Sequence, residues 1–240
     1  MVIRKIYNIK STLIFCFDNI KVRRLDMIID IEGTDGSGKQ TQTKLLKDYL
    51  EGKGKKVKLI SFPNYESNSS APVKMYLNGE IGESAECLDG HQTSVLYAVD
   101  RLLTMSQINV KDYDYILFDR YVPSNMIHQS IKIKNDLLVD SYLEWLEDFE
   151  YGKLKLPKPD VTLFLDMPPE ASIKLARARA EYKSGATKDI QERDDDHLIK
   201  AYQRAKYVAE KFNWVTITCM EKEIKTIDEI HKEILTKLGV

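Results

Sequence analysis

The sequence contains no apolar run near the ~18 residues that a membrane-spanning helix needs. Its three cysteines, Cys16, Cys87 and Cys219, are odd in number and far apart, which is typical of neither a disulfide framework nor a zinc site. Four histidines are too few and too scattered for a metal cluster, and a net charge of −1 disfavours a dedicated nucleic-acid-binding protein. We therefore expect a protein of a reducing compartment, the cytoplasm, with neither membrane nor nucleic acid as its partner.

The composition is ordinary for a globular protein, with 43% hydrophobic and 30% charged residues in a chain of 240. Residues 1–26 differ from the rest, because they carry six basic and only two acidic residues. We favour a natural start at Met27, or a loosely ordered extension, over an organelle-targeting segment for this stretch. Residues 27–240 are long enough for one α/β domain.

Strand and helix patterns alternate from Met27 onward, which predicts a doubly wound, five-stranded parallel sheet with helices on both faces. The predicted strands are 28–32, 57–62, 115–119, 161–165 and 214–218. The predicted helices are 39–51, 91–108, 135–149, 169–179, 195–212 and 226–238. In such a sheet, ligands bind at the carboxyl ends of the strands.

A phosphate-binding loop is the most informative motif. After the first strand the chain reads Gly33-Thr34-Asp35-Gly36-Ser37-Gly38-Lys39, and a helical pattern follows. Glycines let backbone N–H groups converge on one phosphate, the helix start adds its positive end, and Lys39 supplies a mobile cation. The position after the lysine departs from the usual pattern, because Gln40 replaces the hydroxyl residue that ligates Mg²⁺ and Thr41 comes one place late. A metal would therefore depend on acidic groups, with Asp35 and Asp119 as candidates.

Other candidate residues follow the predicted strands and helices. Asp119 and Arg120 end the third strand, where a carboxylate can orient Mg²⁺ and an arginine can fork onto a phosphate. Tyr65 follows the second strand, where it can lie against a sugar. Tyr97 and Arg101 stand four residues apart and share one helix face, which can hold a planar base. Each of these patterns also occurs in proteins where the residues only pack or pair.

The segment from Ala176 to Asp196 is rich in basic residues and weakly periodic. It fits either a solvated charged hairpin or a short mobile lid that brings cations onto a transferring phosphoryl group.

Together these stretches resemble the thymidylate kinase family of P-loop nucleoside monophosphate kinases. The resemblance covers 27–240 and depends on the following segments: 32–39, Phe62-Pro63, Asp100-Arg101, Asp119-Arg120-Tyr121, 156–160 leading into 163–165, and Glu192-Arg193. It implies transfer of the γ-phosphoryl group of ATP to dTMP, Mg²⁺ as cofactor, and a homodimer.

The resemblance also implies roles for single residues. ATP would lie on Gly33, Thr34, Asp35, Gly36, Ser37, Gly38, Lys39, Gln40 and Thr41. The substrate side would comprise Asp35, Phe62, Tyr65, Tyr97, Arg101, Arg120, Asn125, His128 and Glu192. Tyr97 would stack on thymine, Arg101 would donate to its O4, Asn125 would face the base, and Tyr65 would crowd out a ribose 2′-hydroxyl. His128 stands where related sequences can carry a tyrosine.

The implied catalytic and metal groups complete the set. Catalysis would rest on Lys39, Asp35, Arg120 and a lid arginine, with Arg177, Arg179 and Arg193 as candidates. Metal binding would fall to Asp35, Asp119 and Glu192. Alternatives are a kinase for another nucleoside monophosphate, such as CMP or UMP, and a non-catalytic P-loop protein. A guanine-reading switch is disfavoured, because the chain contains no Asn-Lys dipeptide.

Overall fold

The computed structural model describes residues 25–82, 84–182 and 195–240, with the backbone alone for 176–182 and 195. Five parallel strands form one sheet in the order β2-β3-β1-β4-β5. Their bounds are β1 Met27–Glu32, β2 Val57–Ser61, β3 Tyr115–Asp119, β4 Val161–Asp166 and β5 Val215–Thr218. The predicted five-stranded parallel sheet is confirmed, and each strand lies within one residue of its predicted bounds. Most of the predicted extension, residues 1–24, lies outside the described residues.

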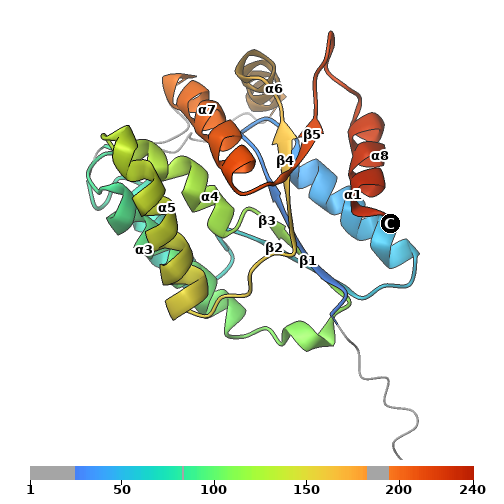
Figure 1. The fold of residues 1–240 in the computed structure, drawn as a ribbon, viewed down its shortest axis with the longest axis horizontal. Coiled ribbons are helices and arrows are strands. Elements are labelled where there is room, and N and C mark those ends of the chain that lie inside the picture. Colours follow the sequence, from blue (N-terminus) through green and yellow to red (C-terminus); the bar gives the residue numbers. More distant parts are fainter. Residues whose placement is uncertain (1–24, 83, 183–194) are drawn as a thin grey trace, which may run out of the picture.

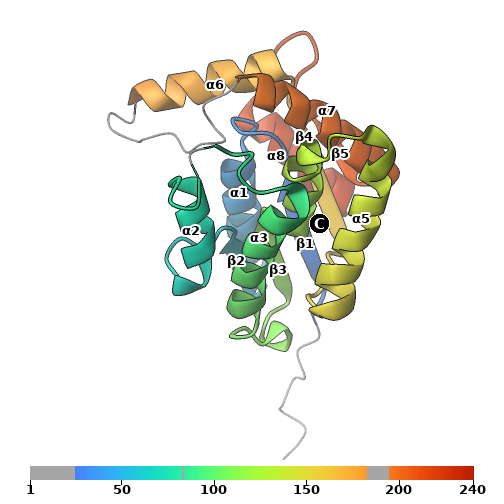
Figure 2. The same ribbon diagram turned by 90° about the vertical axis from the view of Figure 1, so that its left-hand side faces the viewer.

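Helices cover both faces of the sheet (Figure 1). On one face lie α1 Lys39–Gly52 and α8 Ile227–Leu238. On the other lie α3 Gly90–Met105, α4 Val122–His128, α5 Val139–Glu147 and α7 Asp195–Lys211. A shorter helix, α2 Ala71–Leu77, packs on α3, and α6 Pro169–Tyr182 lies beyond the carboxyl ends of the strands (Figure 2).

Strand β1 shows how this sequence builds two unlike layers. Ile29 and Ile31 point to the side of α1 and α8, where they pack with Leu46 and Leu50 of α1. Each fully buried aliphatic side chain contributes about 1.5–3 kcal/mol to folding. The opposite side of β1 carries two acids, of which Glu32 ends the strand and is fully buried. The strand therefore places an acidic side chain at the carboxyl end of the sheet, directly before the glycine-rich loop.

Two helices were not predicted. Helices α2 and α4 are each seven residues long, which is too short for a clear 3.6-residue period. Both carry a proline in their first turn, where the missing N–H costs nothing. Helix α5 also begins four residues later than predicted, after a 3₁₀ turn at Asp136–Leu138, and continues as a π-helical segment at Asp148–Lys153.

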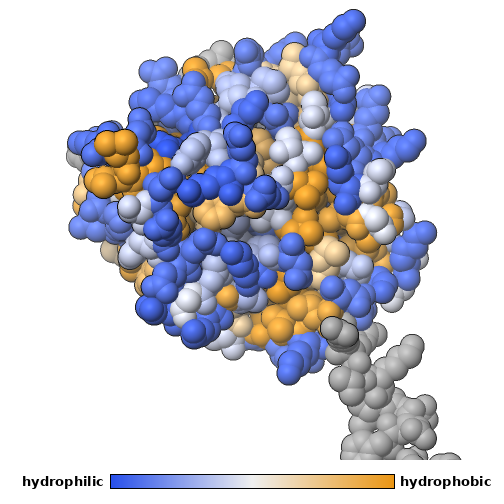
Figure 3. All heavy atoms as spheres, viewed as in Figure 1, coloured by the Kyte–Doolittle hydropathy of each residue, from blue (hydrophilic) through white to orange (hydrophobic). Residues whose placement is uncertain are grey.

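The surface in Figure 3 is mainly hydrophilic, with scattered hydrophobic groups. Within the described ranges, no helix combines the length and apolar character needed to cross a bilayer.

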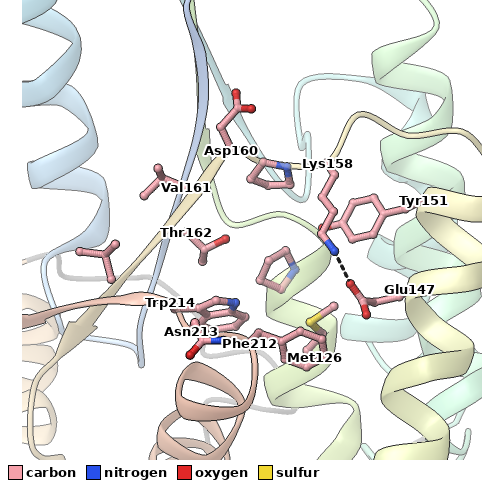
Figure 4. Close-up of a pocket in the computed structure, with 13 residues that line it drawn as sticks. Met126, Glu147, Tyr151, Lys158, Asp160, Val161, Thr162, Phe212, Asn213 and Trp214 are labelled. Atoms are coloured by element: carbon pink, nitrogen blue, oxygen red, sulfur yellow. Dashed lines mark hydrogen bonds and ion pairs between the residues drawn. The ribbon is translucent and has the colours of Figure 1, made fainter. Parts of the chain in front are cut away.

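A cavity of about 240 Å³ opens at the amino ends of β4 and β5 (Figure 4). Tyr151 and Trp214 line it, and at its rim Lys158 pairs with Glu147 at 2.6 Å. Ligands of parallel α/β sheets bind at the opposite, carboxyl edge, so this cavity lies away from the predicted site.

Candidate active site

The glycine-rich loop joins β1 to α1 at the carboxyl edge of the sheet. Gly36 and Gly38 have φ values of +85° and +90°, a region that side chains strongly disfavour. A Cβ on Gly36 would lie 2.3 Å from the carbonyl oxygen of Ser172 in α6, so the loop packs tightly on that helix. Gly38 is the N-cap of α1 and offers no side-chain cap. The first N–H groups of α1 therefore remain available to an anion such as a phosphate.

Lys39 is the first residue of α1, and its side chain is 7% exposed. Its ammonium group donates to the carbonyl oxygen of Thr34 at 2.8 Å and lies 3.6 Å from Oδ1 of Asp35. Burial and the nearby charge of Arg120 lower the pKa of Lys39 to about 8. A phosphate placed at the loop would favour the charged form of this lysine.

Arg120 contacts the same carboxylate oxygen as Lys39. It follows β3 and has a φ of 67°, and its Nη2 donates to Oδ1 of Asp35. Its Nη1 lies 3.0 Å from Nε2 of His128. Burial opposes the charge of Arg120, but Asp35 and Glu32 outweigh it and raise the pKa of Arg120. The structure thus brings together four predicted site residues: Lys39, Asp35, Arg120 and His128.

Charge pairing also sets the state of the two partners of Arg120. Burial opposes ionisation of Asp35, but the charges of Arg120 and Lys39 outweigh it and lower the pKa of Asp35. Burial and the charge of Arg120 lower the pKa of His128 well below its usual range. His128 is therefore neutral, and its Nε2 accepts the hydrogen bond from Arg120.

Glu32 holds the backbone that carries Arg120 in position. Its carboxylate accepts from the backbone N–H of Tyr121 at 3.1 Å and from the hydroxyl of Ser124 at 2.8 and 2.9 Å. These bonds fix the turn from β3 into α4, which carries Arg120. Burial raises the pKa of Glu32 despite the nearby charge of Arg120.

The candidate metal ligands do not form a closed cage. Across the described part of the chain, no group of three or more His, Cys, Asp or Glu side chains could hold a metal by itself. Asp35 is bound to both cations, whereas Asp119 lies half-buried at the end of β3. Mg²⁺ typically uses one or two carboxylates together with substrate phosphates and water, so each of these acids is a chemically suitable ligand. Gln40 is exposed and Thr41 half-buried at the start of α1.

A second buried ion pair joins Arg101, which is 1% exposed, to Glu150, which is 0% exposed. Its Nε and Nη2 donate to the two carboxylate oxygens at 2.6 Å each. Asn125 donates to the same carboxylate at 3.2 Å and to the carbonyl oxygen of Ser94 at 3.3 Å. Two of the predicted base-facing residues therefore converge on one buried acid.

Three further predicted substrate residues, Tyr97, Tyr65 and Phe62, differ in their exposure. Tyr97 is half-buried on α3, and Tyr65 is 52% exposed in the loop after β2. Phe62 is 4% exposed, and its ring packs against Tyr121 at 5.7 Å between centroids, so it belongs to the core beneath the site. Asp100 accepts the N–H of Asn64 at 2.8 Å, which ties the loop after β2 to α3.

The predicted lid residues are only partly described. Arg177 and Arg179 belong to α6, where the structure describes only their backbone. Glu192 and Arg193 lie outside the described residues.

Three residues that hold the site together were not predicted as site residues: Glu32, Ser124 and Glu150. Glu150 stands four residues after buried Leu146 and continues the buried face of α5, which also holds Val139 and Leu143. An acid on the apolar face of a helix needs a buried cation, and that pattern would have indicated Glu150. Ser124 carried no comparable signal.

The glycine-rich loop follows the central strand of a parallel sheet, Lys39 begins the next helix, and Arg120 follows the adjacent strand. This arrangement defines a P-loop nucleotide-binding protein of the phosphotransferase type. The family model for thymidylate kinase matches residues 31–234. The chain therefore belongs to the thymidylate kinase family.

Individual relatives agree with this assignment. A thymidylate kinase of Mycobacterium tuberculosis is 31% identical over 171 residues, covering 70% of this chain and 78% of the relative. One from Plasmodium falciparum is 28% identical over 212 residues and covers 88% of both chains. The solved thymidylate kinase of Candida albicans has the same fold, with a TM-score of 0.66, 23% identity and coverage of 90% of this chain and 92% of that one.

Proposed function

We propose that this protein transfers the γ-phosphoryl group of ATP to dTMP, giving dTDP and ADP. The observation that carries the proposal is that Lys39 from the glycine-rich loop and Arg120 from the end of β3 reach the same oxygen of Asp35. Phosphoryl transfer brings two polyanions to contact distance, and catalysis consists mainly of positioning and charge neutralisation. Lys39 and Arg120 would together supply the positioning and the positive charge.

The reaction needs no strong general base, because the attacking oxygen of dTMP is a phosphate oxygen that is already ionised near pH 7. Asp35 keeps Lys39 and Arg120 close together although both are positive. Lys39 would follow the phosphoryl group of ATP, and Arg120 would hold the acceptor phosphate. A lid arginine, Arg177, Arg179 or Arg193, would add a further cation and limit access of water.

Mg²⁺ belongs to the same proposal. Asp119 and Asp35 are the carboxylates of the described residues that would hold it, and Glu192 is a further candidate. The ion would neutralise charge on the phosphates of ATP. Gln40 at the start of α1 would be a poor direct ligand for Mg²⁺, so these carboxylates and the nucleotide would coordinate the ion.

Base selection follows from the direction of the hydrogen bonds. Arg101 can only donate, which suits O4 of thymine and opposes the amino group of cytosine. Asn125 uses its NH₂ group on Glu150 and Ser94, so its carbonyl oxygen is the end that can accept from N3–H of thymine. Tyr97 would stack on the ring, and Tyr65 would lie against the sugar.

A substrate panel tests the proposal directly. We would measure ADP release with ATP, Mg²⁺ and each common nucleoside monophosphate. We expect dTMP to be best, and dCMP to be worse by ~10⁴-fold because mismatched buried donors discriminate strongly. The missing methyl group of dUMP is worth only ~1–3 kcal/mol, so dUMP should be a poorer substrate that still turns over. Equal rates with dCMP or AMP would contradict the assignment of the base pocket.

A homodimer through α3 is also proposed. The outer face of α3 carries Val95 and Leu103, 39% and 46% exposed, two turns apart. Val99 lies between them and is half-buried. An apolar stripe on the solvent side of a helix fits a second copy of the chain. Light scattering during gel filtration should give twice the chain mass, and Leu103→Glu should give the monomer mass.

The domain limits and the location are part of the proposal. One domain over residues 27–240 is supported by the family match to 31–234. A cytoplasmic location is supported by Cys87 and Cys219, which are both free thiols in the structure.

A further inference from the structure

Glu150 has an unusual position for a carboxylate. It lies in the π-helical segment Asp148–Lys153 that continues α5, and its side chain is 0% exposed. Its chain neighbour Tyr151 lines the cavity at the amino ends of β4 and β5 (Figure 4), whereas Glu150 contacts Arg101. Single π turns in helices occur frequently at functional sites.

The contacts of Glu150 leave little freedom to its partners. One carboxylate oxygen accepts a hydrogen bond from Nε of Arg101. The other accepts hydrogen bonds from Nη2 of Arg101 and from the NH₂ group of Asn125. A two-point contact fixes both the position and the plane of a guanidinium group. The third nitrogen of Arg101, Nη1, lies 3.4 Å from the carbonyl oxygen of Tyr121, which limits rotation further.

The charge balance favours this arrangement. Burial opposes the charge of Arg101, but Glu150 outweighs it, and the pKa of Arg101 is raised. Without an anion, a 1% exposed guanidinium would lie unpaired in the interior. Glu150 thus keeps Arg101 in place, and its contact with the NH₂ group of Asn125 fixes the orientation of that amide.

We propose that Glu150 is the positioning residue that sets base selectivity, by holding Arg101 and Asn125 so that they present one donor and one acceptor to a pyrimidine. Such a pair matches a carbonyl beside a ring N–H, as in thymine or uracil, and mismatches cytosine at both atoms. The inference rests on the proposed function. It adds a residue that itself contacts neither substrate nor phosphate.

Glu150→Gln is the sharpest test, because it keeps the size of the side chain and removes the charge. The new NH₂ group must face either Arg101 or Asn125, and both of these present N–H groups. We expect kcat/KM for dTMP to fall by about 10²-fold, mainly through KM, and the preference for dTMP over dCMP to fall at least about tenfold. The kcat with saturating dTMP should stay within about fivefold of the parent value, because Lys39 and Arg120 are untouched.

Two further variants separate positioning from general damage. Glu147→Gln makes the same chemical change at the end of α5, where Glu147 pairs with Lys158, and it should leave the dTMP to dCMP ratio unchanged. Glu150→Asp keeps the charge but is one methylene shorter, and its ratio should lie between those of the parent and Glu150→Gln. If Glu150→Gln does not fold, by circular dichroism, Glu150→Asp decides alone.

The outcomes are distinct. A folded Glu150 variant that keeps the parent ratio of kcat/KM for dTMP and dCMP overturns the inference while the proposed function stands. A parent protein that releases no ADP with dTMP overturns the proposed function, and the inference falls with it. A lowered ratio in the Glu150 variants, with Glu147→Gln at the parent value, supports the positioning role.

Discussion

Replacing Lys39 with methionine tests the centre of the proposed mechanism. Methionine keeps most of the buried volume but removes the ammonium group that donates to Thr34 and faces Asp35. Loss of one preorganised electrostatic donor typically lowers kcat by ~10²–10³-fold, about 2.7–4 kcal/mol of transition-state stabilisation. We expect that loss for Lys39→Met, together with a dTMP dissociation constant within about threefold of the parent value, because interactions made in the transition state act on kcat.

The assay combines steady-state kinetics with binding. ADP release gives kcat and KM for each substrate, and calorimetry gives the dissociation constant of dTMP. Lys44→Met is the matched control, since Lys44 lies on the same helix and is exposed. It should leave kcat within about twofold, as most surface substitutions are nearly neutral. The stability cost of Lys39→Met should be about 1 kcal/mol, because the carbonyl oxygen of Thr34 loses its donor.

Two results would refute this reasoning. A kcat that stays within tenfold of the parent would show that Lys39 does not act on the transferring phosphoryl group. An equal loss of dTMP affinity and kcat would show that Lys39 only shapes the loop.

Two smaller predictions concern packing and thiol chemistry. Gly36→Ala and Gly38→Ala both place a side chain at positive φ, but only the first meets backbone, at the carbonyl of Ser172. Gly36→Ala should therefore lower the free energy of unfolding by about 1–3 kcal/mol more than Gly38→Ala, as measured by urea denaturation; equal losses would contradict the packing of the loop on α6. Burial raises the pKa of Cys219 to about 12, so its thiolate fraction at pH 8 is about 10⁻⁴, whereas Cys87 is exposed. Iodoacetamide at pH 8 followed by peptide mapping should find native protein alkylated at Cys87 and unmodified at Cys219, and rapid labelling of Cys219 would contradict its burial.

The sheet was predictable because each of its strands can be recognised from a short segment of sequence. Buried parallel strands are short apolar runs, and β3 has the same bounds, Tyr115–Asp119, in the sequence pattern and in the structure. The phosphate loop was predictable for a similar reason, because its glycines are required by backbone conformation within seven consecutive residues. The meeting of Lys39 and Arg120 also followed from topology, since β1 and β3 are neighbours in the sheet and end at the same edge.

The partners of the base-facing residues could not be predicted in the same way. Arg101 and Glu150 are 49 residues apart, and their contact depends on how α3 and the end of α5 pack. Helical spacing indicated that Tyr97 and Arg101 share a face, but it could not distinguish an arginine that faces a ligand from one that is held by a buried acid. The structure shows that Nε and Nη2 of Arg101 are held by Glu150, and its contact with a base remains a prediction.

The cations of this site are held in place by acids before any phosphate arrives. Glu32 fixes the turn that carries Arg120, and Asp35 binds Arg120 and Lys39. Arg120 adopts a left-handed backbone conformation, which costs of order 1 kcal/mol for a residue other than glycine and persists only when its surroundings enforce it. A phosphate bound here would offer these cations the same kind of partner as the carboxylate of Asp35, so binding would exchange one anion for another and leave neither cation unpaired. The free-energy cost of orienting the cations would then be met during folding and would not add to the barrier of phosphoryl transfer.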